Sequence, residues 1–338
     1  MDPATEPSPP AESAPPPRRR GWWFLLPILA LAYILWFIRL PSFVIEPGPA
    51  EDVEPLIHVQ QTQVYPSQGH FLLTAVSFYQ PNVYQALGAW LSRSESVLPE
   101  RDLLAPGQTQ QQETQVALSQ MDQSKIDAAV VALTRYAGYP AKHGMGALIE
   151  SVGPGTPADG QLFAGDLIAA IDGKPITSSS QVGPPIRAAG AGHPVTFTVQ
   201  AGGQTRTVSV APANVRGVDH PIVGISVVDS FPFPLTINSG DIGGPSAGLM
   251  WTLGLIDLIT PGDLTEGRTI AGTGTIALDG TVGPIGGIQQ KVVAAQRSRA
   301  TVFFAPAGEA ADARSVAHGI TIVPVRTYLD ALTFLGQH

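Results

Sequence analysis

A glycine-rich turn that leads into a long apolar run constrains the fold of this chain more than any other feature. Residues 241–248 read Asp-Ile-Gly-Gly-Pro-Ser-Ala-Gly, and the apolar run from Leu249 to Ile259 follows them. This pattern predicts a loop that feeds the N-terminus of a buried helix. The helix dipole and the unpaired N–H groups at such an end stabilise a negatively charged oxygen. Ser246 is therefore either a simple helix cap or a nucleophile.

A second helical pattern places a lysine among apolar residues. Ile288, Lys291, Val292 and Ala295 recur at i, i+3, i+4 and i+7, so they share the face that points into the core. Burial disfavours the ammonium and lowers the pKa of a lysine, which can then act as a general base near neutral pH. The alternatives are a lysine that extends its head group to water or one that pairs with a carboxylate.

Together these two segments resemble the proteolytic domain of the Lon protease family. In that family, a serine in a G-P-S-A-G loop is activated by a lysine that follows a P-I-G-G segment, and residues 244–248 and 284–287 match these motifs. Between them, residues 272–280 are similar to the family's T-G-x-I-x-L-x-G strand and turn.

The resemblance implies a serine endopeptidase with a Ser246–Lys291 dyad. It also implies three supporting residues: Thr273 orients the lysine, Gly244 belongs to the loop whose amides hold the oxyanion, and Asp241 lies near the family's acidic residue. The implied fold is an α/β (α+β) Lon-type proteolytic domain.

The composition limits the class of protein. The chain has 338 residues, of which 44% are hydrophobic, enough for more than one domain. Its formal net charge is -8, and the only basic cluster is residues 18–20, so we expect no nucleic-acid partner. Zero cysteines exclude disulfides and thiol catalysis, and the seven histidines lack H-E-x-x-H spacing, so we expect no metal. The sequence has no G-x-x-x-x-G-K-[ST] loop, so we expect no ATP and no cofactor.

The N-terminal part predicts a membrane anchor. Residues 1–20 are rich in Pro, Ala, Ser and Glu, which predicts a disordered cytoplasmic tail. Residues 21–39 then form an apolar stretch with three arginines before it and one at its end, which predicts a single transmembrane helix with the rest of the chain outside the cytoplasm. A cleaved signal peptide and a buried core helix are the alternatives. The prolines and acids of residues 40–56 predict an extended extracytoplasmic spacer.

Residues 141–212 resemble a PDZ domain. Residues 162–173 carry most of the match, and Gly144-Met145-Gly146-Ala147 is similar to the family's carboxylate-binding loop. The resemblance implies capture of an extended peptide by strand addition. Residues 183–185, Gly-Pro-Pro, interrupt the helix that walls such a groove, so that helix either starts at Pro184 and is short, or the groove is distorted. A small β-domain that only packs against its neighbour is the alternative.

The domain order follows from these segments. Strands alternate with helices over residues 213–338, and the strands within residues 57–140 are expected to join the same protease domain, so the PDZ domain is an insertion. The resemblance is to membrane-anchored, PDZ-containing, ATP-independent Lon-like proteases of bacteria. It implies protein or peptide substrates outside the cytoplasm, a PDZ module that recruits or regulates, and the option of a homo-oligomer.

Two other functions remain open. Residues 244–248 also fit the G-x-S-x-G elbow of α/β-hydrolases, which would need a later histidine such as His318. In the non-enzymatic alternative, the chain is a membrane-tethered PDZ adaptor that binds peptides and carries an inactive Lon-like domain.

Overall fold

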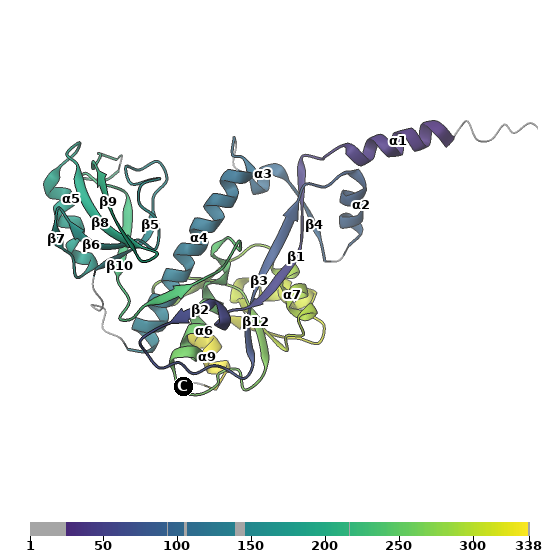
Figure 1. The fold of residues 1–338 in the computed structure, drawn as a ribbon. Coiled ribbons are helices and arrows are strands. Elements are labelled where there is room, and N and C mark those ends of the chain that lie inside the picture. Colours follow the sequence, from purple (N-terminus) through teal and green to yellow (C-terminus); the bar gives the residue numbers. More distant parts are fainter. Residues whose placement is uncertain (1–24, 93, 105–106, 139–145, 216, 337–338) are drawn as a thin grey trace, which may run out of the picture.

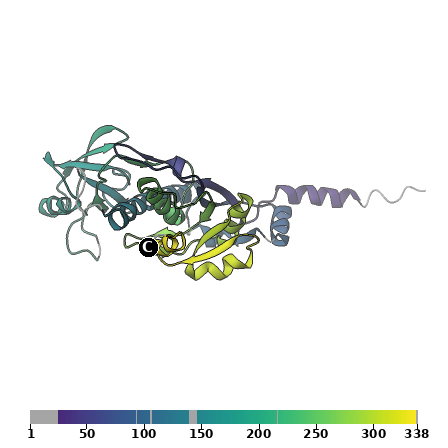
Figure 2. The ribbon, with the colours of Figure 1, turned by 90° about the horizontal axis from the view of Figure 1, so that it is seen from below.

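A central sheet domain lies between an N-terminal helix at one end and a smaller β-domain at the other (Figures 1 and 2). The structure is a computed structural model of the whole chain, and it describes residues 25–92, 94–104, 107–138, 146–215 and 217–336. The cytoplasmic tail expected over residues 1–20 lies outside these described residues.

The central sheet has six strands in the order β16-β15-β12-β3-β1-β4. Strands β3, β12, β15 and β16 run parallel, whereas β1 is antiparallel to β3 and to β4. Because successive side chains of a strand point to opposite faces, Phe71 and Leu73 enter one core and Leu72 enters another. The strands are β1 (Ser42–Asp52), β3 (His70–Tyr79), β4 (Ser96–Pro99), β12 (Thr269–Gly272), β15 (Val302–Pro306) and β16 (Thr321–Val325).

Helices cover both faces of this sheet. On the face of Phe71 lie α4 (Gln110–Val130), α6 (Gly248–Ile259) and α9 (Tyr328–Phe334), and on the face of Leu72 lie α7 (Ile288–Arg297) and α8 (Ala310–Ser315). A π-helical turn (Val131–Tyr136) continues α4. The mixed α/β architecture predicted from the sequence is confirmed. Shorter elements complete the domain: α2 (Val83–Leu91), α3 (Glu100–Leu103), and the paired strands β2 (Ile57–Val59) with β11 (Leu235–Ile237) and β13 (Thr275–Ile276) with β14 (Val282–Gly283).

The β-domain, residues 146–229, is inserted between α4 and β11. Its sheet runs β10-β5-β6-β8-β9, with β7 paired to β6, around a core that includes Ile149, Ile168 and Phe197. The sheet takes in β10, which lies beyond the boundary at residue 212 that the sequence suggested. Its elements are β5 (Ala147–Val152), β6 (Leu167–Ile171), β7 (Lys174–Pro175), α5 (Gly183–Ala189), β8 (Val195–Ala201), β9 (Gln204–Val210) and β10 (Ile225–Asp229).

Residues 42–52 form strand β1 of the sheet rather than part of a spacer. Phe43 and Val44 are fully buried, and β1 pairs with β3 on one side and β4 on the other. Two of the prolines that suggested an extended linker, Pro47 and Pro49, lie at a register shift between Pro47 and Ala50, where the ladder is interrupted. A side chain at Gly48 would meet the carbonyl oxygen of Ala75 at 2.9 Å, so the backbones approach closely there.

The helix α1 (Leu25–Phe37) falls within the stretch expected to cross a membrane, residues 21–39. Residues 21–24 lie outside the described part of the chain, and α1 has 13 residues, whereas a span needs about 20. None of its residues is buried. Among the residues that the structure describes, no helix is both long enough and apolar enough to cross a membrane.

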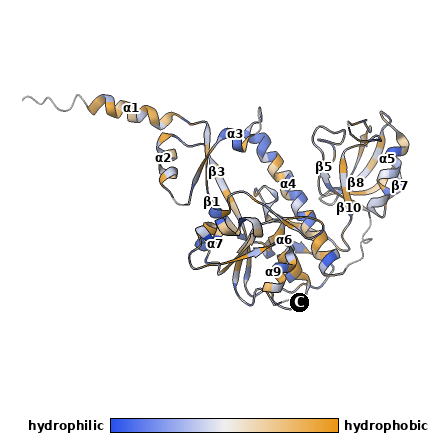
Figure 3. Cartoon of the chain, turned by 180° about the vertical axis from the view of Figure 1, so that it is seen from behind, coloured by the Kyte–Doolittle hydropathy of each residue, from blue (hydrophilic) through white to orange (hydrophobic). Residues whose placement is uncertain are grey.

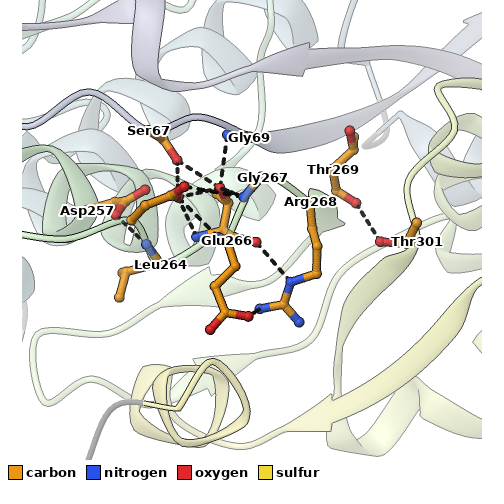
Figure 4. A network of polar contacts seen from close by, with 11 residues as sticks. Ser67, Gly69, Asp257, Leu264, Glu266, Gly267, Arg268, Thr269 and Thr301 are labelled. Carbon is orange, nitrogen blue, oxygen red and sulfur yellow. Dashed lines mark hydrogen bonds and ion pairs between the residues drawn. The ribbon is translucent and has the colours of Figure 1, made fainter.

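A polar network ties the turn between α6 and β12 to the segment that enters β3 (Figure 4). Asp263 Oδ1 accepts hydrogen bonds from Ser67 Oγ at 2.8 Å and from the Thr265 N–H at 3.0 Å. Thr265 Oγ1 in turn accepts from the Gly69 N–H at 3.0 Å. Burial alone would raise the pKa of Asp263, but the hydrogen bonds from Thr265 and Ser67 outweigh it and lower that pKa. The network thus fixes the start of β3, whose far end lines the candidate active site.

Candidate active site

Ser246, Lys291 and Thr273 meet at the C-terminal end of β12, an interior strand of the central sheet. Lys291 Nζ lies 2.6 Å from Ser246 Oγ and donates to Thr273 Oγ1 at 3.1 Å. Thr273 Oγ1 donates its own hydrogen to the Ser246 carbonyl oxygen at 2.9 Å. Since that hydroxyl hydrogen is engaged, Thr273 can only accept from the lysine. Thr273 therefore orients the amine, and a neutral Lys291 has a lone pair free to accept the serine proton.

Burial controls the charge of Lys291. Its side chain is 2% exposed and lies on the face of α7 that also buries Ile288 and Val292. Desolvation lowers the pKa of Lys291 from 10.5 to about 7, and the negative charge of Glu309 opposes this shift. A substantial fraction of the amine is therefore neutral at physiological pH, as a general base requires.

The loop before α6 presents the serine through close backbone contacts. Ser246 lies in a 3₁₀ turn (Pro245–Ala247) that runs into α6. Gly244 has a φ of 86°, a conformation that favours glycine, and its N–H donates to the Ala117 carbonyl oxygen at 2.6 Å. A side chain at Gly243 would meet the Ala117 Cβ at 2.8 Å. The two glycines thus allow the loop to lie directly on α4.

Helix α4 is the part of the site that sequence reasoning missed. Ser124 Oγ donates to the Pro245 carbonyl oxygen at 3.0 Å, and Ala117 accepts from Gly244. Both residues lie more than 100 positions before the serine, and no motif connects them with it. The first turns of α4 are polar, so apolar spacing that could have indicated a helix begins only near Met121, one of its buried residues.

A cavity of about 660 Å³ opens over Ser246 and Lys291. Its walls are the end of β3, one face of α4 and the loop before Ser246. Asp241 is exposed at this cavity, whereas Ser246, Lys291 and Thr273 are in direct contact. His318 is exposed and does not line the cavity, so the arrangement favours lysine over histidine as the partner of Ser246. The lining residues outside the loop include Leu56, Leu73, Thr74, Val76, Phe78, Thr114, Leu118 and Met121.

Only the second half of the predicted carboxylate-binding loop of the β-domain, residues 144–147, belongs to the described part of the chain. Gly144 and Met145 lie outside the described residues, while Gly146 and Ala147 lead into β5. Ala147 pairs with Asp229 of β10 on one side and with Ile168 of β6 on the other. An interior strand has no free edge to which a peptide can add, so Ala147 and the rest of β5 do not provide the edge for strand addition.

A groove of about 220 Å³ lies between α5 and β10, an edge strand of this sheet. Arg187 lines it from α5, and residues 220–225 and 227 line it from β10 and the loop before it. The carbonyls of Val223 and Gly224 accept from the N–H groups of Ala158 and Gly153. The C=O of one residue and the N–H of the next point in opposite directions in a trans peptide. The N–H groups of Gly224 and Ile225 therefore point away from Ala158 and Gly153.

Helix α5 begins at Gly183, and both prolines lie in its first turn. An N–H group in that turn has no partner within the helix, so the N–H groups that proline lacks cost no hydrogen bond.

Comparison with known families matches two parts of the chain. Residues 237–333 match the Lon protease (S16) C-terminal proteolytic domain, and residues 115–211 match a PDZ domain. The chain contains a Lon proteolytic domain and a PDZ domain. Ser246, Thr273 and Lys291 all fall inside the Lon match, whereas β10 lies between the two matched segments.

Individual relatives align with the Lon domain over a short stretch. The chain is 45% identical over 73 residues to the Lon protease of Phenylobacterium zucineum (strain HLK1), covering 22% of this chain and 9% of that protein. It is 35% identical over 91 residues to Lon protease 2 of Bacillus subtilis (strain 168), covering 27% of this chain and 16% of that protein. The chain therefore spans only a small part of the length of these relatives.

Among solved structures, the PDZ domain of the SdrC-like protein from Listeria monocytogenes is similar to part of this chain. The identity is 28%, and the alignment covers 25% of this chain and 90% of that one with a TM-score of 0.24. The equivalent domain from Listeria innocua is 29% identical, with coverage of 25% and 97% and the same TM-score of 0.24.

Proposed function

We propose that the chain is a serine endopeptidase in which Ser246 attacks the peptide carbonyl and Lys291 accepts the serine proton. The 2.6 Å contact between Ser246 Oγ and the buried Lys291 Nζ carries this proposal. The match to the Lon proteolytic domain supports a serine protease independently. The oxyanion of the tetrahedral intermediate binds backbone N–H groups of the loop around Gly244 and the 3₁₀ turn that follows it, next to the positive end of α6.

The shape of the cavity supports an extended polypeptide substrate. Strand β12 pairs with β3 only as far as Leu73, so the side of residues 74–78 that faces away from β1 borders the cavity. An extended peptide can pair with this backbone and bring a carbonyl carbon to Ser246. Such a substrate is an unfolded protein segment or a peptide. We propose that its cleavage requires no ATP.

We further propose that the protease is attached to a membrane through α1 and acts outside the cytoplasm. Every residue of α1 is at least partly exposed, and its side chains are almost all apolar, as Figure 3 shows. Apolar side chains on every side of a helix are more stable in contact with lipid acyl chains than with water. The arginines at residues 18–20 support an orientation with the N-terminus in the cytoplasm.

The PDZ domain is proposed to recruit substrates by a free C-terminus in the groove between α5 and β10. Arg187 provides a positive charge in this groove, and the amides that follow Val223 and Gly224 point away from the domain body. A terminal carboxylate can bind these groups while the peptide adds to the open edge of β10.

Reversing the charge at the groove is expected to weaken peptide binding. Arg187→Glu should lower the affinity for a peptide with a free C-terminal carboxylate by about tenfold or more, since a charged hydrogen bond is worth about 1.5–3 kcal/mol. Isothermal titration with the free-acid and the amidated peptide measures this. Ala188→Glu, at an exposed position on the same helix, introduces a glutamate outside the groove and should change little. Equal losses in the two variants would place the binding site elsewhere.

Digestion of casein without ATP tests the proposed activity. Wild-type protein should degrade casein, and Ser246→Ala should not, because this change removes the attacking oxygen. That oxygen is the only heavy atom lost, so the loop should keep its structure. Circular dichroism confirms that the variant is folded. Cleavage by Ser246→Ala at the wild-type rate would refute the proposal. Peptide binding without cleavage by the wild type would instead favour the adaptor function.

A further inference from the structure

Helix α2 exposes large apolar side chains on a surface without charge. Leu87, Trp90 and Leu91 are 55%, 76% and 70% exposed, and α2 has no acidic or basic residue. A side chain added at Gly88 would meet no atom within 4 Å, so this side of the helix is open. Helices that face water usually present polar or charged residues on the solvent side. The exposed face of α2 is therefore unsuited to water.

Helix α2 is fixed to the middle of α1. Tyr84 Oη donates to the Ala32 carbonyl oxygen at 2.9 Å, and the rings of Tyr84 and Trp36 lie 6.2 Å apart. Figures 1 and 3 show α2 next to the end of α1 that leads into the sheet domain, on the side of the molecule opposite the PDZ domain, while the rest of α1 extends outward. Ala32 lies five residues before the end of α1. If the apolar part of a bilayer surrounds α1 as far as its C-terminal end, it therefore also contacts α2.

The chemistry of this surface fits lipid better than a protein partner. A protein partner covers one face of a helix, but α1 is apolar on all sides, and only its Ala32 and Leu35 are half-buried. Tryptophan and tyrosine, here Trp36, Tyr84 and Trp90, are the side chains that favour the boundary between head groups and acyl chains. The cation of Arg39 follows α1 directly, and its Nη1 donates to the Gln80 carbonyl oxygen at 3.0 Å. Such a residue can hold its charge at the polar side of that boundary.

We propose that α2 is a second lipid-contacting element, whose Leu87, Trp90 and Leu91 insert into the boundary between lipid head groups and acyl chains when α1 enters a bilayer. This inference rests on the proposed membrane attachment. Attachment at two helices, rather than one, fixes the orientation of the protease domain relative to the membrane. Strand β4, which begins five residues after α2 ends, connects this contact to the sheet.

The absence of cysteine from the chain allows a direct test, because a single introduced cysteine can be labelled without background. We would attach an environment-sensitive dye to full-length Leu87→Cys, to Leu31→Cys in α1, and to Leu329→Cys, an exposed control on α9. Each protein is mixed with phosphatidylcholine vesicles whose acyl chains carry nitroxide quenchers. The dyes at Leu87 and Leu31 should lose most of their fluorescence, and the dye at Leu329 should not. The same label at Leu91 guards against a local disturbance at Leu87.

The possible outcomes separate this inference from the attachment itself. Quenching at Leu31, with the dyes at Leu87 and Leu91 still accessible to aqueous iodide, overturns the role of α2 and leaves attachment through α1 intact. Quenching at neither helix overturns both proposals. Self-quenching of the α2 dyes without vesicles, at concentrations where the Leu329 dye is unaffected, shows that a second copy of the chain covers α2 and also overturns the inference.

Discussion

Lys291→Met is expected to abolish peptide cleavage while the chain stays folded. Methionine has a similar length and fills the buried position, but it cannot accept the proton of Ser246. Loss of a base that acts as one unit with its nucleophile costs about a thousandfold or more in turnover. The assay is the initial rate of casein degradation at equal protein concentration and at pH 8, where the wild-type amine is mostly neutral.

The same variant should be at least as stable as the wild type. The pKa of Lys291 is depressed in the folded protein, so below this pKa folding must bury a charge that the unfolded chain keeps in water. Methionine removes that cost, and thermal unfolding near neutral pH should show an equal or higher Tm. Lys174→Met, at an exposed lysine of the PDZ domain, is the matched control and should keep full activity. A fully active Lys291→Met protein would exclude this lysine as the base.

Cleavage by the wild type should depend steeply on pH below neutrality. Only neutral Lys291 can accept the serine proton, and its pKa is lowered to about 7, chiefly by burial. The value of kcat/KM should therefore rise about tenfold per pH unit up to about pH 7 and then level off. Rates on a short peptide over pH 5 to about pH 9, with folding followed by circular dichroism at each pH, measure this profile.

Glu309→Gln is expected to shift the midpoint of the pH profile to lower pH. The negative charge of Glu309 raises the pKa of Lys291 against the effect of burial, and its carboxylate accepts from the Ile285 N–H at 3.1 Å. Glutamine keeps an acceptor for that N–H but removes the charge. The midpoint of the profile should therefore move to lower pH. A midpoint that stays in place or moves upward would show that another group controls the profile.

The two residues of the candidate dyad could be singled out because the patterns that mark them are local in the sequence. Ser246 lies in a compact motif, and the spacing of Lys291 with Ile288 and Val292 placed the lysine on a buried helix face, as the structure has it. The contact between the two side chains depends on the packing of α6 and α7 against opposite faces of one sheet. No pattern within either helix specifies that packing.

The groove that we propose for peptide binding could not be located from local pattern alone. Two glycine-containing segments, residues 144–147 and 220–224, each precede a β-strand, and the first lies closer to the segment that resembles a PDZ domain most. Only the strand order shows that β5 is interior and that β10 is an edge strand. Strand β1 shows the same limit, because Pro47 and Pro49 suggest a linker until pairing places them at an irregularity in the ladder.

Covalent capture of the nucleophile tests the dyad most directly, because it does not depend on knowing the natural substrate. A fluorophosphonate forms a bond from phosphorus to the attacking serine oxygen as fluoride leaves, and the serine proton passes to the base. Peptide mapping by mass spectrometry should find one adduct, on Ser246, which forms faster as the pH rises through about 7 and forms far more slowly in Lys291→Met. An adduct on another residue, or an equal rate in Lys291→Met, would contradict the Ser246–Lys291 dyad.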